Sequence, residues 1–352
     1  EALRLGVSLG PYVTTICAAM AVRRPERPRA GRSLPLLLLP LLFGILSRAF
    51  VQAPKRPSQL ARHAESSEME VSRPLQPVVL CPAQFGTAED YAELKETLAK
   101  QGFALYPAPL SRLDWLKIVP STLTKEFFTA ELRPNKTLGF FYEALDQAMA
   151  AVDDDFGAEA AVAFLGHSIG GWVARSYIGE VLGEEVAKKR VRSLVTLGTP
   201  HRPPPSDSPV SALDQTRGLL TYINERFPSG APLDPANVTC VAGRGTKVSP
   251  SVEALWETAG NKIWNETENR SALLEEVVAF ASYLPLSGST FGVEGDGLIP
   301  VDTALMEGCQ SVVLDDCNHA DFVPMLGESL RLPKTYQWYG SDGFIEKWID
   351  FL

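Results

Sequence analysis

An apolar run that ends in a serine between glycines decides the fold: residues 160–171 read AAVAFLGHSIGG. Its apolar part has the length of a buried strand, and the residues from Ile169 onward have the pattern of a helix. A serine on such a sharp strand-to-helix turn has a strained backbone, so its neighbours must be small, and Gly166 and Gly170 stand at both two-residue offsets. The helix behind Ser168 also favours negative charge close to it. The stretch therefore predicts that Ser168 presents its hydroxyl at the end of a strand.

Short apolar runs alternate with longer helical patterns on both sides of this stretch. The expected strands are 78–81, 103–106, 160–165, 193–197, 238–242 and 311–314, and the expected helices are 88–101, 138–152, 169–182 and 344–351. The strand runs are continuously apolar, as in parallel strands that are covered on both faces. This order predicts an α/β fold with a mainly parallel central sheet and helices on both of its faces.

Two stretches interrupt this alternation. Residues 113–141 are rich in aromatic side chains, and residues 201–235 begin with a cluster of prolines. Exposed together, they would form an apolar surface beside the serine, as a lid over a binding groove does. We interpret them as lid-like insertions, and the alternative is that they are core aromatics under long loops.

A serine hydroxyl needs a base to act as a nucleophile, and the four histidines leave one candidate. His63 falls in the amino-terminal segment, His167 adjoins the serine and points away from it in such a turn, and His201 suits a structural or substrate-side role. His319 follows the last expected strand. Enzymes with a nucleophile in this kind of turn place serine, acid and histidine in that order along the chain, which also selects His319.

The acid that orients the base must then lie between Ser168 and His319. Asp296 is the best candidate, because it stands between two glycines that allow a tight turn. Asp315 and Asp316 are too near His319 in sequence to orient its ring easily, and Asp234 lies in a proline-rich loop. The expected catalytic residues are therefore Ser168, Asp296 and His319.

A set of this kind performs acyl transfer, which also needs donors for the tetrahedral oxyanion. One donor should be the backbone N–H of Ile169, directly after the serine. The other should come from the loop Pro82-Ala83-Gln84-Phe85-Gly86, which follows the first expected strand. We expect the N–H of Gln84 to serve there, with Phe85 as the alternative.

Five motifs carry a family resemblance. They are Gly-His-Ser-Ile-Gly-Gly at 166–171, Thr-Leu-Gly-Thr-Pro-His at 196–201, Gly-Asp-Gly-Leu-Ile-Pro at 295–300, Asp-Trp-Leu at 114–116 and Asp-Gln-Thr-Arg-Gly at 214–218. The first three resemble the α/β-hydrolase superfamily of lipases and esterases. All five together resemble predicted lipases of plants, algae and cyanobacteria, with GPI inositol-deacylase-like and triacylglycerol-lipase-like hydrolases as the nearest named relatives. The match covers 78–352.

The resemblance implies an α/β-hydrolase fold and hydrolysis of carboxylic esters with no cofactor. It does not identify the substrate, for which a lipid ester is our expectation, with peripheral contact to a membrane. Deacylation of an inositol or transfer of the acyl group to an acceptor is an alternative on the same scaffold. A binding protein that has kept the pocket without catalysis is a weaker alternative.

Charge and cysteine content exclude other classes. The formal net charge is −9, but residues 1–77 hold 11 basic and 5 acidic residues, so the remaining 22 basic and 37 acidic residues give −15. Residues 78–352 are acidic enough to repel phosphate backbones, so no nucleic-acid partner is expected. The cysteines show no metal-ligand spacing, so no metal is expected. Cys309 and Cys317 flank a strand and could pair, although free buried thiols are the preferred interpretation.

The basic amino-terminal segment, residues 1–77, is typical of a targeting presequence. Five arginines between positions 23 and 32 precede the apolar stretch 34–46, which is too short to span a bilayer as a helix but suits a signal peptide of about 20–49. Ser47-Arg48-Ala49 offers small residues for cleavage. We therefore expect a targeting presequence and linker at 1–77, of which the signal peptide is removable, and a catalytic domain at 78–352.

The residues after the cleavage site refine this expectation. Phe50 and the basic, hydroxyl-rich residues up to 77 resemble the second, plastid-directing part of the bipartite presequences in algae with complex plastids. Secretion is one alternative, and an anchor in the endoplasmic reticulum membrane that is never removed is another. Passage through the endoplasmic reticulum fits the four N-x-S/T sequons, which begin at Asn135, Asn237, Asn265 and Asn269.

Overall fold

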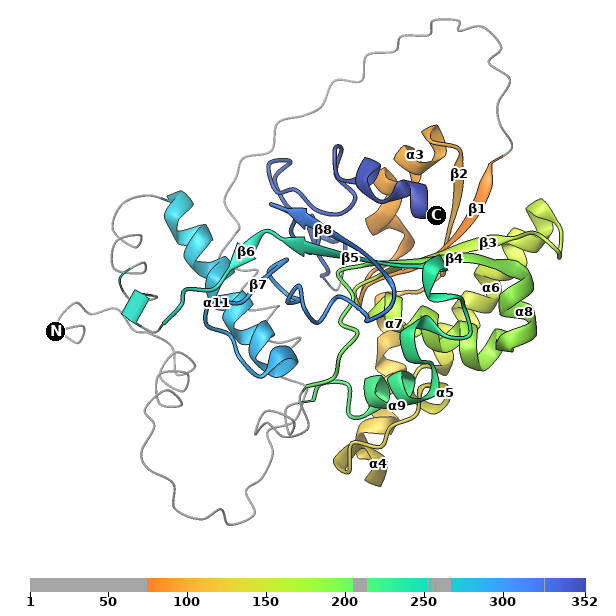
Figure 1. The fold of residues 1–352 in the computed structure, drawn as a ribbon, viewed down its shortest axis with the longest axis horizontal. Coiled ribbons are helices and arrows are strands. Elements are labelled where there is room, and N and C mark those ends of the chain that lie inside the picture. The colour runs from red at the N-terminus through yellow and green to blue at the C-terminus, as the bar shows by residue number, and fades with distance from the viewer. Residues whose placement is uncertain (1–74, 205–213, 252, 255–256, 258–266, 326) are drawn as a thin grey trace, which may run out of the picture. The chain divides into compact units, whose positions relative to one another are not determined.

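Six parallel strands form the central sheet of the computed structural model, which describes residues 75–204, 214–251, 253–254, 257, 267–325 and 327–352. The strands are β1 (Gln76–Cys81), β2 (Phe103–Pro107), β3 (Val162–His167), β4 (Val191–Leu197), β5 (Val238–Arg244) and β8 (Gln310–Asp315). Their order in the sheet is β2-β1-β3-β4-β5-β8, and every neighbouring pair is parallel (Figure 1). Each expected strand is present, and the mainly parallel sheet predicted from the sequence is confirmed.

Helices connect these strands and cover the sheet. The longer ones are α3 (Ala92–Lys100), α6 (Gly139–Phe156), α7 (Ile169–Tyr177), α8 (Gly183–Arg190), α9 (Leu219–Arg226) and α11 (Thr267–Ser287). A turn of 3-10 helix, η3 (Ala88–Tyr91), leads into α3, and a π-helical turn, η5 (Ile178–Leu182), joins α7 to α8. The expected helix at 344–351 is wrong as an α-helix: two 3-10 turns, η9 (Ile345–Lys347) and η10 (Ile349–Phe351), stand there and use tighter i→i+3 bonds.

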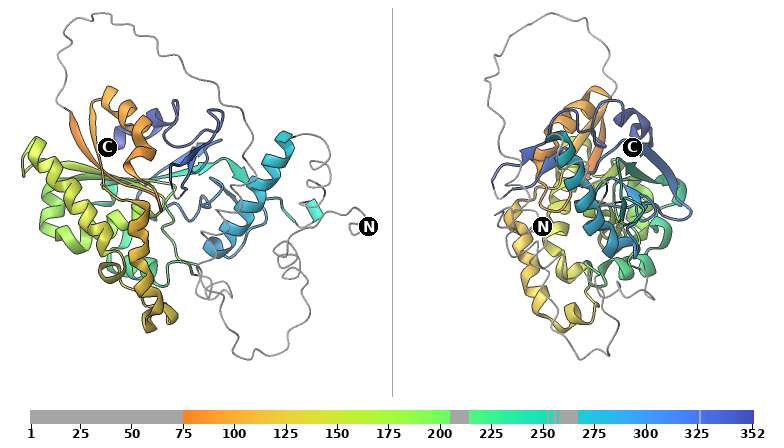
Figure 2. Two further views of the ribbon diagram at one scale, coloured as in Figure 1. Left: turned by 180° about the vertical axis from the view of Figure 1, so that it is seen from behind. Right: turned by 90° about the vertical axis from the view of Figure 1, so that its left-hand side faces the viewer.

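Alternate residues of each central strand are buried on opposite faces of the sheet. Val79 of β1 and Phe164 of β3 belong to one core, which contains α6, α7 and α9. Their neighbours Val78 and Leu165 belong to a second core, which contains α3 and the carboxyl-terminal segment around Trp348. Figure 2 shows α3 and the carboxyl-terminal segment on one side of the sheet, with α6 and α8 on the other. Because both faces are covered, the strands are apolar throughout, as the sequence pattern indicated.

The two insertions pack against each other. The first holds η4 (Arg112–Leu123), α4 (Lys125–Phe128) and α5 (Pro134–Thr137) before α6 begins. The second contributes a turn in which both carboxylate oxygens of Asp214 accept from backbone N–H groups, those of Thr216 and Gly218, at 2.8 Å. A Cβ at Gly218 would lie 1.8 Å from the carbonyl oxygen of Ala130, so only glycine permits this approach. The motif at 214–218 therefore has a structural explanation.

The aromatic side chains of the first insertion divide between core and surface. Trp115, Phe127, Phe140 and Phe141 are buried in the core beside α6. The exposed apolar residues of the same segment are Leu113, Leu116, Val119, Leu123 and Phe128. Both interpretations made from the sequence thus hold in part: four of the rings fill the core, and an apolar surface that includes Phe128 remains outside.

The remaining small elements lie at the carboxyl-terminal half of the chain. They are η7 (Pro228–Gly230), η8 (Pro235–Asn237), the antiparallel pair β6 (Thr246–Lys247) and β7 (Glu294–Gly295), and the antiparallel pair β9 (Phe322–Val323) and β10 (Leu330–Arg331). The expected presequence, apart from its last three residues, and the residues 205–213 of the second insertion lie outside the described residues. Among the helices that are described, none combines the length and apolar character needed to cross a membrane.

Candidate active site

Ser168 occupies the turn between β3 and α7 with a left-handed backbone, at φ 55° and ψ −130°. A non-glycine residue in such a conformation costs on the order of 1–3 kcal/mol, and it persists only where its surroundings impose it. The surroundings here are close: a Cβ at Gly166 would lie 2.3 Å from the Cα of Gly171, and one at Gly170 would lie 2.1 Å from the carbonyl oxygen of Cys81. The glycines on either side of Ser168 are thus sterically required, and the serine is left partly exposed at the carboxyl end of β3.

Asp296 and His319 form a buried hydrogen-bonded pair. Nδ1 of His319 lies 2.7 Å from Oδ2 of Asp296, and the backbone N–H of His319 donates to the carbonyl oxygen of Asp296 at 2.8 Å. The other carboxylate oxygen accepts from the N–H groups of Leu298 at 3.0 Å and Ile299 at 2.7 Å. An ionised carboxylate can only accept, so Nδ1 of His319 carries the proton and Nε2 is left as the basic atom.

Tyr339 completes the shell of Asp296, and sequence reasoning missed it. Its hydroxyl donates to Oδ2 of Asp296 at 2.7 Å and accepts from the N–H of Gly243 at 2.8 Å. Burial raises the pKa of this hydroxyl well above its usual range, so it remains a donor. Two glycines make room for it, since a Cβ at Gly198 would lie 2.8 Å and one at Gly243 would lie 2.9 Å from the Tyr339 oxygen. No local pattern distinguishes this tyrosine in the sequence.

The other candidate acids bond elsewhere. Asp315 pairs with Arg244, Asp316 is exposed in a left-handed turn at φ 57°, and Asp234 accepts from the N–H of Ala236 at 2.9 Å at the start of η8. Asp296 is the carboxylate that the described residues place on His319.

The remaining described histidines are buried away from solvent. His167 lies behind the serine, and burial together with nearby His319 lowers its pKa to about 3. His201 contacts the hydroxyl of Thr196 at 3.0 Å and the guanidinium of Arg175 at 3.3 Å, and burial with that cation lowers its pKa well below the usual value. Both rings are uncharged at pH 7. Because both are buried and bonded to other groups of the protein, neither is placed to act as the base.

The turn that holds Ser168 contacts the loop that holds His319. Nε2 of His167 lies 2.9 Å from the carbonyl oxygen of His319, and the centroids of the two rings are 5.0 Å apart. Within the described part of the chain the hydroxyl of Ser168 makes no hydrogen bond. The structure thus brings the serine turn and the Asp296–His319 pair to the same edge of the sheet, at the carboxyl ends of β3 and β8.

The loop after β1 has two uncommitted backbone donors. The N–H of Ala83 donates to the hydroxyl of Tyr91 at 2.8 Å, the N–H of Gly86 to the carbonyl oxygen of Ala83 at 2.9 Å, and the N–H of Thr87 to Asp90 at 2.8 Å. Pro82 has no N–H. Among the described residues, the amides of Gln84 and Phe85 have no acceptor, and neither does that of Ile169 across the sheet edge.

The cysteines of the described region are free thiols. Cys81, Cys240 and Cys317 are buried, and burial raises the pKa of Cys309 to about 11. No group of histidine, cysteine and carboxylate side chains that could hold a metal ion occurs in the described ranges.

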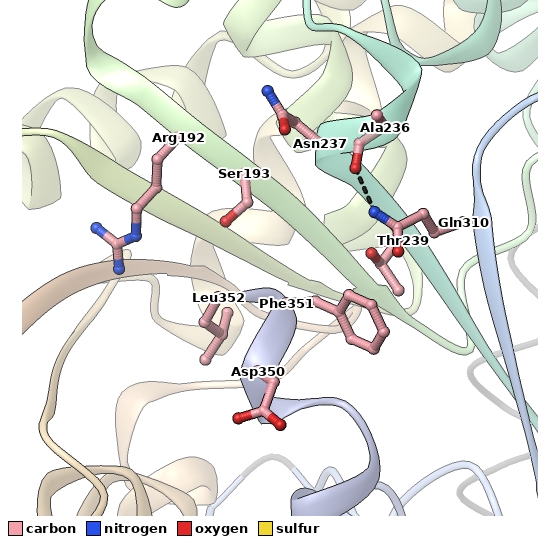
Figure 3. A pocket seen from close by; sticks show the side chains of 9 residues that line it. All are labelled: Arg192, Ser193, Ala236, Asn237, Thr239, Gln310, Asp350, Phe351 and Leu352. Carbon is pink, nitrogen blue, oxygen red and sulfur yellow. Dashed lines mark hydrogen bonds between the residues drawn. The ribbon is translucent and has the colours of Figure 1, made fainter.

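A separate polar hollow of about 230 Å³ lies at the opposite ends of the strands (Figure 3). Ser193 of β4, Thr239 of β5 and Gln310 of β8 line it, and all three stand at the amino-terminal ends of their strands. In open parallel sheets ligands bind at the carboxyl ends, where Ser168 and His319 lie. The hollow is therefore not the candidate site.

The parallel sheet, the strained serine turn at its carboxyl edge and the helices on both faces define an α/β-hydrolase with an esterase- or lipase-like fold. The chain belongs to the family of the PGAP1-like alpha/beta domain, whose model matches residues 77–277. The matched region contains Ser168 and the loop after β1, while Asp296 and His319 lie beyond it. The superfamily resemblance seen in the sequence is confirmed, and the resemblance to plant, algal and cyanobacterial lipases stays a prediction.

Several solved structures are similar to the chain at low identity. The mature form of the lipase BlEst2 from Bacillus licheniformis is 14% identical, with 73% of this chain and 89% of that chain covered and a TM-score of 0.40. The α/β-hydrolase MGS-MChE2, from a sediment metagenome of the Mar Chica lagoon in Morocco, is 15% identical, with 72% and 86% covered and a TM-score of 0.31. Polyneuridine aldehyde esterase is 20% identical, with 46% and 50% covered and a TM-score of 0.25. No curated protein matches the chain.

Proposed function

We propose that this chain hydrolyses carboxylic esters by acyl transfer to Ser168, with His319 as base and Asp296 as the residue that orients it. The observation that supports this most is the buried bond of 2.7 Å between Nδ1 of His319 and Oδ2 of Asp296, next to the serine turn. With Nδ1 protonated, Nε2 accepts the proton of the Ser168 hydroxyl while its oxygen attacks the ester carbonyl.

The negative charge that develops on the carbonyl oxygen needs donors that are already in place. The uncommitted amides of Gln84 and Ile169 suit this role. Ile169 directly follows Ser168, and Gln84 lies in the loop after β1, where a Cβ at Gly170 would come within 2.7 Å of the carbonyl oxygen of Pro82. The alcohol leaves with the proton from Nε2 of His319. A water molecule, activated by the same nitrogen, then attacks the acyl-enzyme and releases the acid.

A lipid ester is the proposed substrate, and the first insertion supports this choice. We refer to residues 82–86, the loop after β1, as the oxyanion loop. Trp115 of η4 packs against Phe85 of this loop, with ring centroids 5.4 Å apart. The same short segment exposes Leu113 and Leu116 by about two thirds of their surface, at 67% and 63%. An aliphatic surface directly beside the oxyanion loop suits an apolar acyl chain and peripheral contact with a membrane. Transfer of the acyl group to an alcohol, or deacylation of an inositol, is the alternative that the family suggests.

Fluorophosphonate labelling of Ser168→Ala tests the chemistry. We expect the variant to lose both labelling and hydrolysis of a panel of lipid and short-chain esters. Ser193→Ala, at the opposite end of the sheet, is the matched control and should behave like the wild type. Normal labelling of Ser168→Ala would show that another residue is the nucleophile. Repeating the panel with an added alcohol acceptor separates hydrolysis from acyl transfer.

We also propose that the segment ahead of β1, which begins at Gln76, contains a targeting sequence that is removed in one or two steps, with entry to the secretory route and a plastid as the destination. The order of basic run, apolar core and small residues at 47–49 supports it. Amino-terminal sequencing of the native protein should find a start at or after Phe50. A native chain that still contains 34–46 would instead be anchored in a membrane.

A further inference from the structure

We infer that Tyr91 and His167 are positioning residues, which together tie the oxyanion loop to the backbone of His319. The inference rests on the proposed function, since it concerns how the two halves of that site keep their relative geometry. Neither side chain is assigned to touch the substrate.

A continuous line of hydrogen bonds joins the two loops. The N–H of Ala83 donates to the hydroxyl oxygen of Tyr91 at 2.8 Å, that hydroxyl lies 2.8 Å from Nδ1 of His167, and Nε2 of His167 lies 2.9 Å from the carbonyl oxygen of His319. Tyr91 ends η3, His167 ends β3, and His319 follows β8. Three elements that are far apart in the sequence are therefore joined through two side chains.

The chemistry of the partners determines the direction of each bond. The carbonyl oxygen of His319 can only accept, so Nε2 of His167 must carry a proton. The ring is neutral, because burial holds its pKa at about 3, so Nδ1 is unprotonated and accepts from Tyr91. Tyr91 donates its one proton to His167, and its oxygen accepts from the amide of Ala83. Every polar atom of both side chains is then satisfied in a single arrangement.

Packing makes this arrangement rigid. Tyr91 is 1% exposed and His167 is fully buried. The Tyr91 ring meets His167 edge-on with centroids 5.8 Å apart, and it meets Phe322 edge-on at 5.5 Å. Trp338 lies 5.5 Å from the His167 ring. A close-packed aromatic cluster leaves the two polar side chains little freedom to change partners.

Each end of this series of hydrogen bonds is a backbone group whose position matters for the proposed reaction. The bond to Tyr91 commits the amide of Ala83, which leaves the amides of Gln84 and Phe85 as the uncommitted donors of the loop. At the other end, His167 holds the carbonyl of His319, while the carbonyl of Asp296 holds its N–H at 2.8 Å. The peptide groups on both sides of the proposed base are therefore fixed, one by the acid and one by His167.

Two substitutions at His167 separate the two bonds. The amide nitrogen of glutamine reaches about as far as Nε2 of histidine, so His167→Gln keeps a donor for the carbonyl of His319 and loses the bond to Tyr91. The shorter side chain of His167→Asn keeps an acceptor for Tyr91 and loses the bond to His319. His167→Leu has neither a donor nor an acceptor, so it loses both bonds and shows the effect of breaking the whole connection.

Turnover is measured per site titrated with a fluorophosphonate, so that unfolded molecules do not count. We expect His167→Asn and His167→Leu to lower kcat by about 10- to 100-fold with little change in KM, the range for a small misplacement of a catalytic group. His167→Gln should recover the part of that loss that comes from the bond to His319, while the part that comes from the bond to Tyr91 should remain. Tyr91→Phe should lower kcat without changing KM, because it frees the amide of Ala83 and loosens the oxyanion loop.

The outcomes that overturn the inference are distinct from those that overturn the proposed function. Equal turnover per titrated site in wild type and His167→Asn would show that His167 only stabilises the fold. Equal losses in His167→Gln and His167→Asn would show that the bond to His319 has no special role. Failure of the proposed function would be seen in the wild type itself, as a chain that is neither labelled nor hydrolytic.

Discussion

Tyr339 and His319 donate to the same oxygen of Asp296, each at 2.7 Å. The two donors therefore share the negative charge of Oδ2. The bond from the tyrosine hydroxyl also fixes the orientation of the carboxylate toward His319. Tyr339 in turn is held by the N–H of Gly243. The proposed acid thus depends on a residue 43 positions away along the chain.

Tyr339→Phe should lower turnover by about 10-fold, because a charged group loses one of its hydrogen bonds and its orientation. The carboxylate would keep its bonds to the N–H groups of Leu298 and Ile299, so the loss should be smaller than that in Asp296→Asn. Tyr336→Phe is the control, since the Tyr336 hydroxyl makes no hydrogen bond to the described residues. Unchanged turnover in Tyr339→Phe would show that Tyr339 has no part in positioning Asp296.

Asp296→Asn should reduce turnover by roughly 10³- to 10⁴-fold, because an amide at this position favours the wrong tautomer of His319. Asp316→Asn is the matched control: Asp316 is exposed, and asparagine tolerates its left-handed backbone at φ 57°. It should remain near wild type. The reverse result, a large loss in Asp316→Asn alone, would transfer the role of the acid to Asp316.

Gly198→Ala should damage both stability and activity. Its backbone is left-handed at φ 54°, and a Cβ there would lie 2.5 Å from Oδ2 of Asp296. Gly157 also has a positive φ, at 88°, but a Cβ there would meet nothing within 4 Å, so Gly157→Ala is the control. Both should lose about 1–2 kcal/mol of unfolding free energy to backbone strain.

Only Gly198→Ala should also lose turnover, because only its new methyl group displaces the acid. Urea unfolding and ester hydrolysis measure the two effects on the same preparations. Full activity in Gly198→Ala would mean that the contact with Asp296 relaxes without moving the carboxylate.

The stability of the fold should fall as pH falls from about 6.5 towards 3, in part because of His167. Its pKa is about 3 in the folded chain, against an ordinary value of 6.5, so the unfolded chain binds a proton in this window that the folded chain does not. The free energy of unfolding therefore decreases with falling pH, by at most about 1.4 kcal/mol per pH unit for one group. His201 contributes with the same sign, since its pKa is also lowered.

His167→Gln removes one of these two contributions. Urea unfolding at pH 7 and pH 4.5 should show a smaller loss of stability in the variant than in the wild type. Identical losses would indicate that the His167 ring is protonated in the folded chain, which would also contradict the direction of the bond from Tyr91.

Much of the fold could be predicted because its signals are local. The six strands are apolar runs of strand length, and burial on both faces of a parallel sheet produces that pattern wherever it occurs. The turn at Ser168 is also encoded locally, since Gly166, Gly170 and Gly171 are needed within three residues of it. His319 followed by elimination from a small set of histidines.

The carboxyl-terminal segment and the first insertion were harder to predict. Residues 344–351 have a helical pattern, yet they form two 3-10 turns around Trp348, which is fully buried and bonded through its ring N–H to the carbonyl oxygen of Tyr339 at 2.9 Å. In 113–141 the sequence could not tell which apolar residues face the core, because short helical pieces of changing direction have no single period.

The sequence by itself determined the class of fold and the serine turn, because spacing and steric limits within a few residues specify them. It predicted His319 as the base and Asp296 as the acid. Only the tertiary structure decided that the carboxylate of Asp296 meets His319, and which tyrosines bond to Asp296 and His167. Those contacts join residues that are 23, 43, 76 and 152 positions apart. A buried tyrosine in a core looks the same in the sequence whether its hydroxyl meets a backbone amide or a catalytic carboxylate, because only the packing of distant elements supplies its partner.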